Sequence, residues 1–241
     1  MSGQSVIEIG MCGKIPSRGD FLAQGLTAGF VDSWNEWLRA VMAVSREQLT
    51  SNWLDTYLTS PVWHFALSAD VCGDDAVIGC LMPSVDQVGR HFPFTLAVAT
   101  NSNPVQALHS GNWAAALQQF ALQTLDDDFD FALWRQSLKQ HVIAWPTSAT
   151  RVEHKNAAQG RAAWAILAEE QPDALALLHH SYQQQFERYC LWWTQGSERI
   201  PPCTLVSSGL PQVSQYAAML DGDWSRWQWQ CAHIKHSGAN A

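Results

Sequence analysis

Two segments of the chain group side chains that can form charge-assisted hydrogen bonds. They read KIPSRGD (residues 14–20) and MPSVDQVGR (residues 82–90), and each combines a Pro-Ser pair with an aspartate, a glycine and an arginine. Bidentate pairs between guanidinium and carboxylate groups would hold two irregular loops rigid. Proline fixes φ and glycine permits positive φ, so both segments are typical of loops with a specific shape. The pattern predicts a charge network across the two loops, formed by Arg18, Asp20, Asp86 and Arg90.

This network has two interpretations, which the residues alone leave open. In the first, the ion pairs only tie the two loops to the rest of the fold. In the second, the loops present a preformed surface to a partner, because loops held by a rigid scaffold often carry binding residues. A third role, catalysis, needs a nucleophile or a phosphate-binding motif in addition.

Known catalytic and nucleotide-binding motifs are absent from the sequence. Residues 10–17 read GMCGKIPS, which lacks the spacing of the phosphate-binding pattern G-x-x-x-x-G-K-[ST]. Neither G-x-S-x-G nor a Cys–His family signature is present. A hydrolase that uses the Pro-Ser/Asp/Arg loops is therefore a weaker alternative, for which the nucleophile and base would come from Ser17, Ser84, Cys80, His64 and His91.

Metal ligands do not occur at the spacings of known sites. The DDDFD segment (residues 126–130) begins like a calcium loop, but its sixth and twelfth positions are Phe131 and Ser137 instead of Gly and Glu. It is more typical of an acidic turn that caps the next helix. A structural zinc site needs four ligands, and no second pair accompanies Cys231, His233 and His236. We expect neither a metal nor a cofactor.

Helical and strand patterns alternate along the first half of the chain. Apolar residues recur at near-helical spacing from Phe30 to about Trp53. Ser33 with Glu36 fits a capping box, and a helix start a few residues earlier is the alternative. Three apolar, β-rich runs follow, and the turn-rich segments between them predict antiparallel neighbours. These runs cover residues 62–67, 76–82 and 92–100.

The second half continues the alternation. Asn103-Pro104 is typical of a helix start, and the helical pattern is interrupted at Gly111. Strand-like runs occur at YCLWWT and CTLVSS, a helix is expected near 212–220, and alternation from Trp227 to His233 predicts a half-buried strand. Together these patterns predict one domain over residues 1–241, with a mixed sheet covered by helices on both faces. The polar, weakly patterned residues 146–161 are expected to form a mobile loop.

Composition excludes several kinds of partner. The net charge is −8, from 14 basic and 22 acidic side chains, which argues against nucleic acid. No run of about 18 apolar residues is available for membrane insertion, and no secretory signal begins the chain. The six cysteines form no C-x-x-C pair and several lie in apolar runs, as expected for reduced thiols in the cytoplasm.

The charged segments belong to a longer set that resembles the TagF (ImpM) proteins associated with bacterial type VI secretion. The matching stretches follow the family's order from about residue 8 to 224, and together they are specific although each alone is weak. His91 stands where an aromatic residue is common. The stretches are GKIPSRGDF, FVDSWNEWL, WLDTYLTSPVWHFAL, GCLMPSVDQVGRHFP, LWWTQGSERIPP and GLP followed by AAMLDGDW.

The resemblance implies a fold and a function that composition and spacing do not show. The implied fold is an α/β three-layer sandwich, which agrees with a largely antiparallel sheet between helices. The resemblance also implies that this chain is a non-enzymatic accessory factor that represses assembly or firing of the secretion machine after translation. The implied partner is the forkhead-associated (FHA) scaffold protein of the machine. An adaptor or chaperone that loads a secreted effector is the alternative.

The candidate binding residues come from the two charged segments and from the segment that contains LWWTQGS. For the adjacent tryptophans, strand geometry places one ring on each side of the sheet, so at least one is core and only the other is a candidate anchor. The candidate residues for partner binding or for the loop network are Lys14, Ser17, Arg18, Asp20, Ser84, Asp86, Arg90, Trp192, Trp193 and Ser197.

Overall fold

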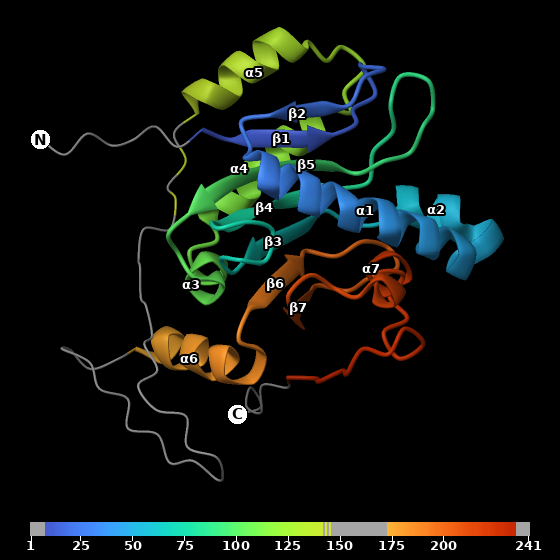
Figure 1. Cartoon of the computed structure of the whole chain (residues 1–241). Coiled ribbons are helices and arrows are strands. Elements are labelled where there is room, and N and C mark those ends of the chain that lie inside the picture. Colours follow the sequence, from blue (N-terminus) through green and yellow to red (C-terminus); the bar gives the residue numbers. More distant parts are fainter. Residues whose placement is uncertain (1–7, 142, 144, 146–172, 235–241) are drawn as a thin grey trace, which may run out of the picture.

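A single antiparallel sheet forms the centre of the molecule (Figure 1). The computed structural model describes residues 8–141, 143, 145 and 173–234, so the loop predicted at 146–161 lies outside the described residues. The seven strands are ordered β2-β1-β5-β4-β3-β6-β7, and each described pairing is antiparallel. Their bounds are β1 (Gly10–Gly13), β2 (Leu22–Gln24), β3 (Trp63–Leu67), β4 (Ala76–Met82), β5 (Phe94–Thr100), β6 (Tyr189–Thr194) and β7 (Cys203–Ser208).

Helices cover both faces of the sheet, which confirms the predicted three-layer α/β sandwich. One face carries α1 (Ala28–Leu49), α2 (Trp53–Leu58) and α7 (Ala218–Asp221), with the 3-10 turns η1 (Thr50–Asn52) and η2 (Val213–Gln215). The other face carries α3 (Pro104–His109), α4 (Asn112–Gln123), α5 (Phe131–Gln140) and α6 (Ala174–Phe186). The sequence predicted a mixed, largely antiparallel sheet, and every pair of described strands is antiparallel.

Two hydrophobic cores, one on each side of the sheet, are built around tryptophans. Trp34 of α1 stacks on Trp192 of β6 with ring centroids 5.9 Å apart, and its Nε1 donates to the Thr95 hydroxyl at 3.0 Å. On the other side, Trp113 of α4 packs edge-on against Trp193 with centroids 5.5 Å apart. Buried indoles usually find a partner for the N–H group, and the bond from Trp34 to Thr95 ties α1 to β5.

The helix starts follow local capping, and the structure decides between the two starts that the sequence left open for α1. Asn103 caps α3 by accepting a hydrogen bond from the Gln106 amide at 3.0 Å, as its Asn-Pro motif predicts. Helix α1 begins earlier than a capping box at Ser33 would place it, because the Thr27 hydroxyl accepts from the Phe30 amide and Phe30 is buried. That box is therefore not the start of the helix.

The strand predicted from Trp227 to His233 is wrong. This segment forms turns and irregular backbone, and its indoles bind separate groups instead of lining a strand. Trp227 Nε1 donates to Asp221 at 2.8 Å and Trp229 Nε1 donates to the Gln215 carbonyl at 3.0 Å. The two indoles are therefore anchored on α7 and η2, respectively. The helix expected near 212–220 consists only of these two short elements.

Candidate functional site

The two charged segments meet at one end of the sheet. Gly13, at the end of β1, pairs with Phe94 at the start of β5, and Met82, at the end of β4, pairs with the same Phe94. The chain therefore leaves β1 and β4 at the same end of the sheet, on either side of β5. We call the two loops that follow, residues 14–20 and 84–91, the charged-loop cluster.

Asp86 is the centre of the charged-loop cluster. Its Oδ2 atom accepts hydrogen bonds from Lys14 Nζ at 2.7 Å and Arg90 Nε at 2.6 Å. Its Oδ1 atom accepts from the backbone amides of Val88 at 3.1 Å and Arg90 at 2.8 Å. Burial alone would raise the pKa of Asp86, but the bonds from Lys14, Arg90 and Val88 outweigh it and hold the pKa well below its usual range. The carboxylate is thus fully occupied by the protein.

Arg90 and the backbone join the two loops to each other. Arg90 Nη2 donates to the Gly19 carbonyl at 2.7 Å, and the Gln87 amide donates to the Arg18 carbonyl at 3.0 Å. These bonds fix the path of the first loop against the second. The loops are consequently one rigid unit, as their proline and glycine content suggests.

The predicted membership of the network needs a correction. Arg18 does not reach a carboxylate, because its guanidinium lies over the Phe131 ring, 4.0 Å from the centroid. Asp20 is exposed and belongs to none of the ion pairs in the described parts of the chain. Lys14, instead of Arg18, is the second cation that pairs with Asp86. The network is therefore Lys14, Asp86 and Arg90.

The two serines of the cluster differ in environment. Ser17 is exposed, whereas Ser84 is buried and its backbone amide and carbonyl both bond the Tyr57 hydroxyl at 2.9 Å. The Ser84 hydroxyl itself has no hydrogen-bond partner within the described residues. Burial raises the pKa of Tyr57, so its hydroxyl stays neutral and able to donate. Neither serine is therefore paired with a base.

The third predicted segment contributes to the cores instead of the surface. Trp192 is fully buried in the α1-side core, and Trp193 is 7% exposed on the α4 side. Their opposite directions follow from strand alternation. Ser197 closes a turn by donating its amide to the Ile200 carbonyl at 2.8 Å, and its hydroxyl is buried without a described partner. The structure does not bring these three residues into the charged-loop cluster.

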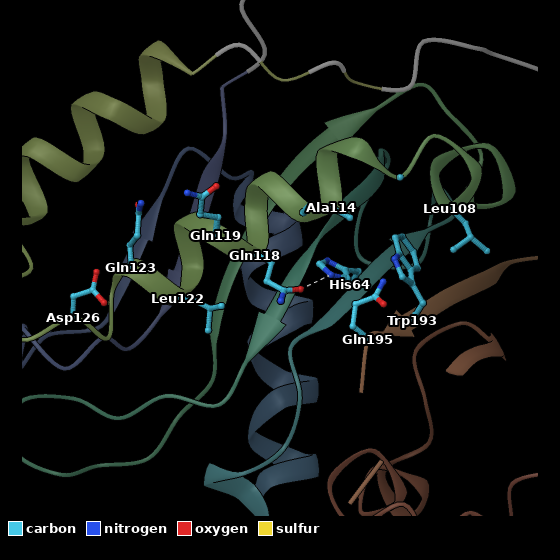
Figure 2. Close-up of a pocket in the computed structure, with 12 residues that line it drawn as sticks. His64, Leu108, Ala114, Gln118, Gln119, Leu122, Gln123, Asp126, Trp193 and Gln195 are labelled. Carbon is cyan, nitrogen blue, oxygen red and sulfur yellow. Dashed lines mark hydrogen bonds between the residues drawn. The ribbon is translucent and has the colours of Figure 1, made fainter. Parts of the chain in front are cut away.

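A groove of about 850 Å³ lies along α4 (Figure 2). No motif in the sequence predicts it. We call it the α4 groove. Its walls are one face of α4, the side chains of His64 and Trp193 from the sheet, and Gln195. His64 Nε2 donates to the Gln118 side-chain oxygen at 2.9 Å, and its buried Nδ1 has no partner within the described residues. Burial lowers the pKa of His64 to about 4, so the imidazole is neutral near pH 7.

Among the described residues, neither the groove nor the cluster assembles a nucleophile with a base. Cys80 pairs with His64 in the sheet register, but it is fully buried and burial raises its pKa to about 12. A neutral, buried thiol is not reactive. His91 packs edge-on against Trp53 and Tyr57, and burial lowers its pKa.

Residues 8–141, 143, 145 and 173–234, which the structure describes, contain no group of three or more His, Cys, Asp or Glu side chains suited to a metal ion. Cys231 and His233 are exposed there, and His236 lies outside the described residues. None of the described helices combines the length and the apolar character needed to cross a bilayer.

Comparison with known proteins places the chain in a family. A family model for the TagF N-terminal domain, described as type VI secretion system-associated, matches residues 10–141. The crystal structure of PA0076 from Pseudomonas aeruginosa PAO1 is similar over 97% of this chain and 100% of that chain, with a TM-score of 0.75 and 29% identity. No curated protein matches the chain. Both charged loops lie within the matched range, and the chain belongs to the TagF family of type VI secretion system-associated proteins.

Proposed function

We propose that this protein is a non-enzymatic, cytoplasmic accessory factor that represses type VI secretion after translation by binding the FHA scaffold protein of the machine. Membership of a secretion-associated family supports the accessory role. The repressor activity and the scaffold partner are what resemblance to TagF proteins implies, and they are the parts that need an experiment.

The observation that carries a binding role is the rigid shape of the charged-loop cluster. Its ion pairs are turned inward on Asp86, while apolar side chains at the same end of the sheet remain exposed. Val88, at the tip of one loop, is 69% exposed, and Phe21, directly after the other loop, is 41% exposed. Exposed apolar residues on a rigid frame are typical of protein-binding surfaces, because little ordering entropy is lost on binding.

A non-enzymatic role is supported by the same contacts. The carboxylate of Asp86 is occupied by four donors from the protein, which leaves it no capacity to act on a substrate. The hydroxyl of Ser84 faces no base. We infer that the cluster shapes a surface and does not perform a reaction.

We also propose that the chain acts as one unit. The family model ends at residue 141, but β6 pairs with β3 and β7 pairs with β6, so both strands complete the sheet that β1 to β5 begin. Trp192 and Trp193 of β6 fill the two cores. A fragment that ends near residue 141 would expose β3 and lose both rings.

Calorimetric titration of the purified scaffold protein into the purified full chain tests the proposal. Val88→Asp places a charge on the exposed loop tip, and we expect it to weaken binding at least about tenfold, as for an interface anchor. Leu177→Asp, at a 42% exposed position on α6, is the matched control and should leave binding unchanged. If the native chain does not bind the scaffold protein, the proposed partner is wrong. If the native and Val88→Asp proteins bind equally well, the proposed docking surface is wrong.

A further inference from the structure

The α4 groove follows one face of α4. Its lining positions recur every three or four residues, from Gly111 just before the helix through Gln123 at its end to Asp126 just after it, which is the spacing of one helix stripe. At 1.5 Å per residue, the stretch from Gly111 to Gln123 is about 18 Å long. This length matches about five residues of extended chain at about 3.3 Å each.

The charge of the groove selects against anions. Among the described residues, neither lysine nor arginine lines it, and His64 is neutral near pH 7 because burial lowers its pKa to about 4. Asp126 is the one described lining residue with a formal charge, and none of the ion pairs within the described residues uses it. Cationic donors make the strongest hydrogen bonds to phosphate and carboxylate ligands, and the described lining has none, so it favours a neutral or cationic ligand over an anionic one. A cationic side chain would find its counter-charge at the Asp126 end.

Amide side chains supply the remaining polar groups of the groove. A carboxamide both donates and accepts hydrogen bonds, so it matches the alternating N–H and C=O groups of an extended backbone. His64 fixes Gln118 by donating to its oxygen at 2.9 Å, which leaves the Gln118 NH2 group as a donor at the groove (Figure 2). The other lining amides are those of Gln119, Gln123 and Gln195.

The floor and walls of the groove are suited to a close backbone approach. Gly111, Ala114 and Ala115 give α4 a low profile at one end of the stripe, and Trp193 and Leu122 provide apolar contact. Behind them, the buried Nδ1 of His64 is an acceptor without a described partner, although the side chain is only 2% exposed.

We propose that the α4 groove binds an extended peptide segment of a partner protein, with a lysine or arginine side chain directed at Asp126. The groove supplies amides for the backbone, a tryptophan for an apolar side chain and a single carboxylate for the cation. The net charge of −8 also favours a basic segment. This inference rests on the proposed function only for the source of the segment, which would be the FHA scaffold protein.

Selection of a phage-displayed library of random dodecapeptides on the immobilised full chain tests the groove without any assumed partner. We expect enriched peptides to carry a lysine or arginine. Synthetic copies should bind the native chain and lose at least about tenfold in affinity for Ala115→Trp, because this exposed helix position is on the groove wall and the indole would block it. Ala43→Trp, at an exposed position on α1 across the sheet, is the matched control and should bind as the native chain does.

A charge-specific pair of variants tests the recognition of the basic side chain. Asp126→Asn should weaken the selected peptides by about threefold to fivefold, as expected for an exposed ion pair. Asp127→Asn, which changes an exposed neighbour outside the groove lining, should have no effect. Replacement of the basic residue in the peptide by alanine should lower its affinity for the native chain by the same factor. The same replacement should leave its affinity for the Asp126→Asn protein unchanged.

The outcomes separate this inference from the proposed function. An absence of enriched peptides, or equal affinity for native and Ala115→Trp proteins, overturns the groove even if the scaffold binds. Peptides that require an open groove support it even if the full-length scaffold does not bind, in which case the proposed function fails and the peptide source is another protein. Displacement of bound scaffold by a selected peptide supports both.

Discussion

The carboxylate of Asp86 accepts a hydrogen bond from Lys14 Nζ at 2.7 Å, although 72 positions separate the two residues in the chain. The side chain of Asp86 is fully buried and that of Lys14 is 15% exposed. The pair therefore bridges the ends of β1 and β4 largely out of water. Loss of one partner from a buried pair is more harmful than loss of an exposed pair, because the remaining charge stays uncompensated.

Asp86→Asn should lower the melting temperature by several degrees and loosen both loops. The amide keeps the size of the carboxylate but leaves the charges of Lys14 and Arg90 without a counter-ion. Asp20→Asn is the matched control, since Asp20 is exposed and unpaired among the described residues. Thermal unfolding followed by circular dichroism measures both variants. Equal melting temperatures would show that Asp86 does not hold the cluster together.

Tyr57→Phe should destabilise the fold by about 1–3 kcal/mol, because it leaves the Ser84 amide and carbonyl without their shared partner. Ser84→Ala is the counterpart. It removes a hydroxyl that has no partner and keeps both backbone bonds, so its effect should stay within about 0.5 kcal/mol. Urea denaturation gives both values. A larger loss for Ser84→Ala than for Tyr57→Phe would mean that the hydroxyl has a role the contacts do not reveal.

Arg18→Ala should cost about 0.5–1 kcal/mol of stability, as expected for a cation–π contact at an exposed site. The guanidinium lies 4.0 Å from the Phe131 ring centroid, and Phe131 begins α5. The loss should disappear when Phe131 is already leucine. A double-mutant cycle by urea denaturation measures this coupling, and additive effects of the two changes would rule out the contact as the source of stability.

The fold should lose stability as the pH falls from about 6.5 to 4. Burial lowers the pKa of His64 from 6.5 to about 4, so the unfolded chain binds more protons than the folded chain in this range. The loss between pH 7 and pH 5 should be about 2 kcal/mol from His64. His179, whose pKa burial also lowers to about 4, contributes in the same direction. Asp86 affects the pH dependence of stability only at lower pH. Its stabilising contribution is lost as the pH falls below 3.8, the pKa of this carboxyl in the unfolded chain.

Urea denaturation of native and His64→Gln proteins at pH 7 and pH 5 measures that dependence. Glutamine does not titrate, so the variant should show a smaller difference between the two pH values. His109→Gln, at an exposed position, controls for the removal of a histidine. The same pH dependence in all three proteins would assign the effect to other groups.

Much of the fold follows from local sequence signals. Strands β3, β4 and β5 lie within one or two residues of the predicted runs, because each run is apolar on both faces and bounded by turn residues. The break at Gly111 separates α3 from α4 as predicted, and Asp130 caps α5 by accepting from the Ala132 and Leu133 amides. These features depend on neighbours in the chain. β2, in contrast, has three residues and no pattern of its own, and it forms only because β1 is beside it.

The candidate site was only partly predictable because its partners are distant in sequence. Two Pro-Ser loops that each contain acidic and basic residues predicted a network. Lys14 and not Arg18 pairs with Asp86, because the Arg18 guanidinium lies over Phe131, whose position α5 sets. Tyr57 bonds Ser84 from a helix 27 positions away. The α4 groove requires the face of α4 to run beside His64 and Trp193, and no motif marks that arrangement.

The most direct test of the central claim is an affinity pull-down of the tagged full chain from a lysate of its own bacterium, identified by mass spectrometry. Arg18→Ala/Arg90→Ala protein of verified fold is run beside it, since Arg90 ties the two loops together. We predict enrichment of the FHA scaffold protein by the native chain and its loss with the double variant. Absence of the scaffold, with one exported protein enriched in its place, would contradict the repressor and indicate an adaptor that loads an effector.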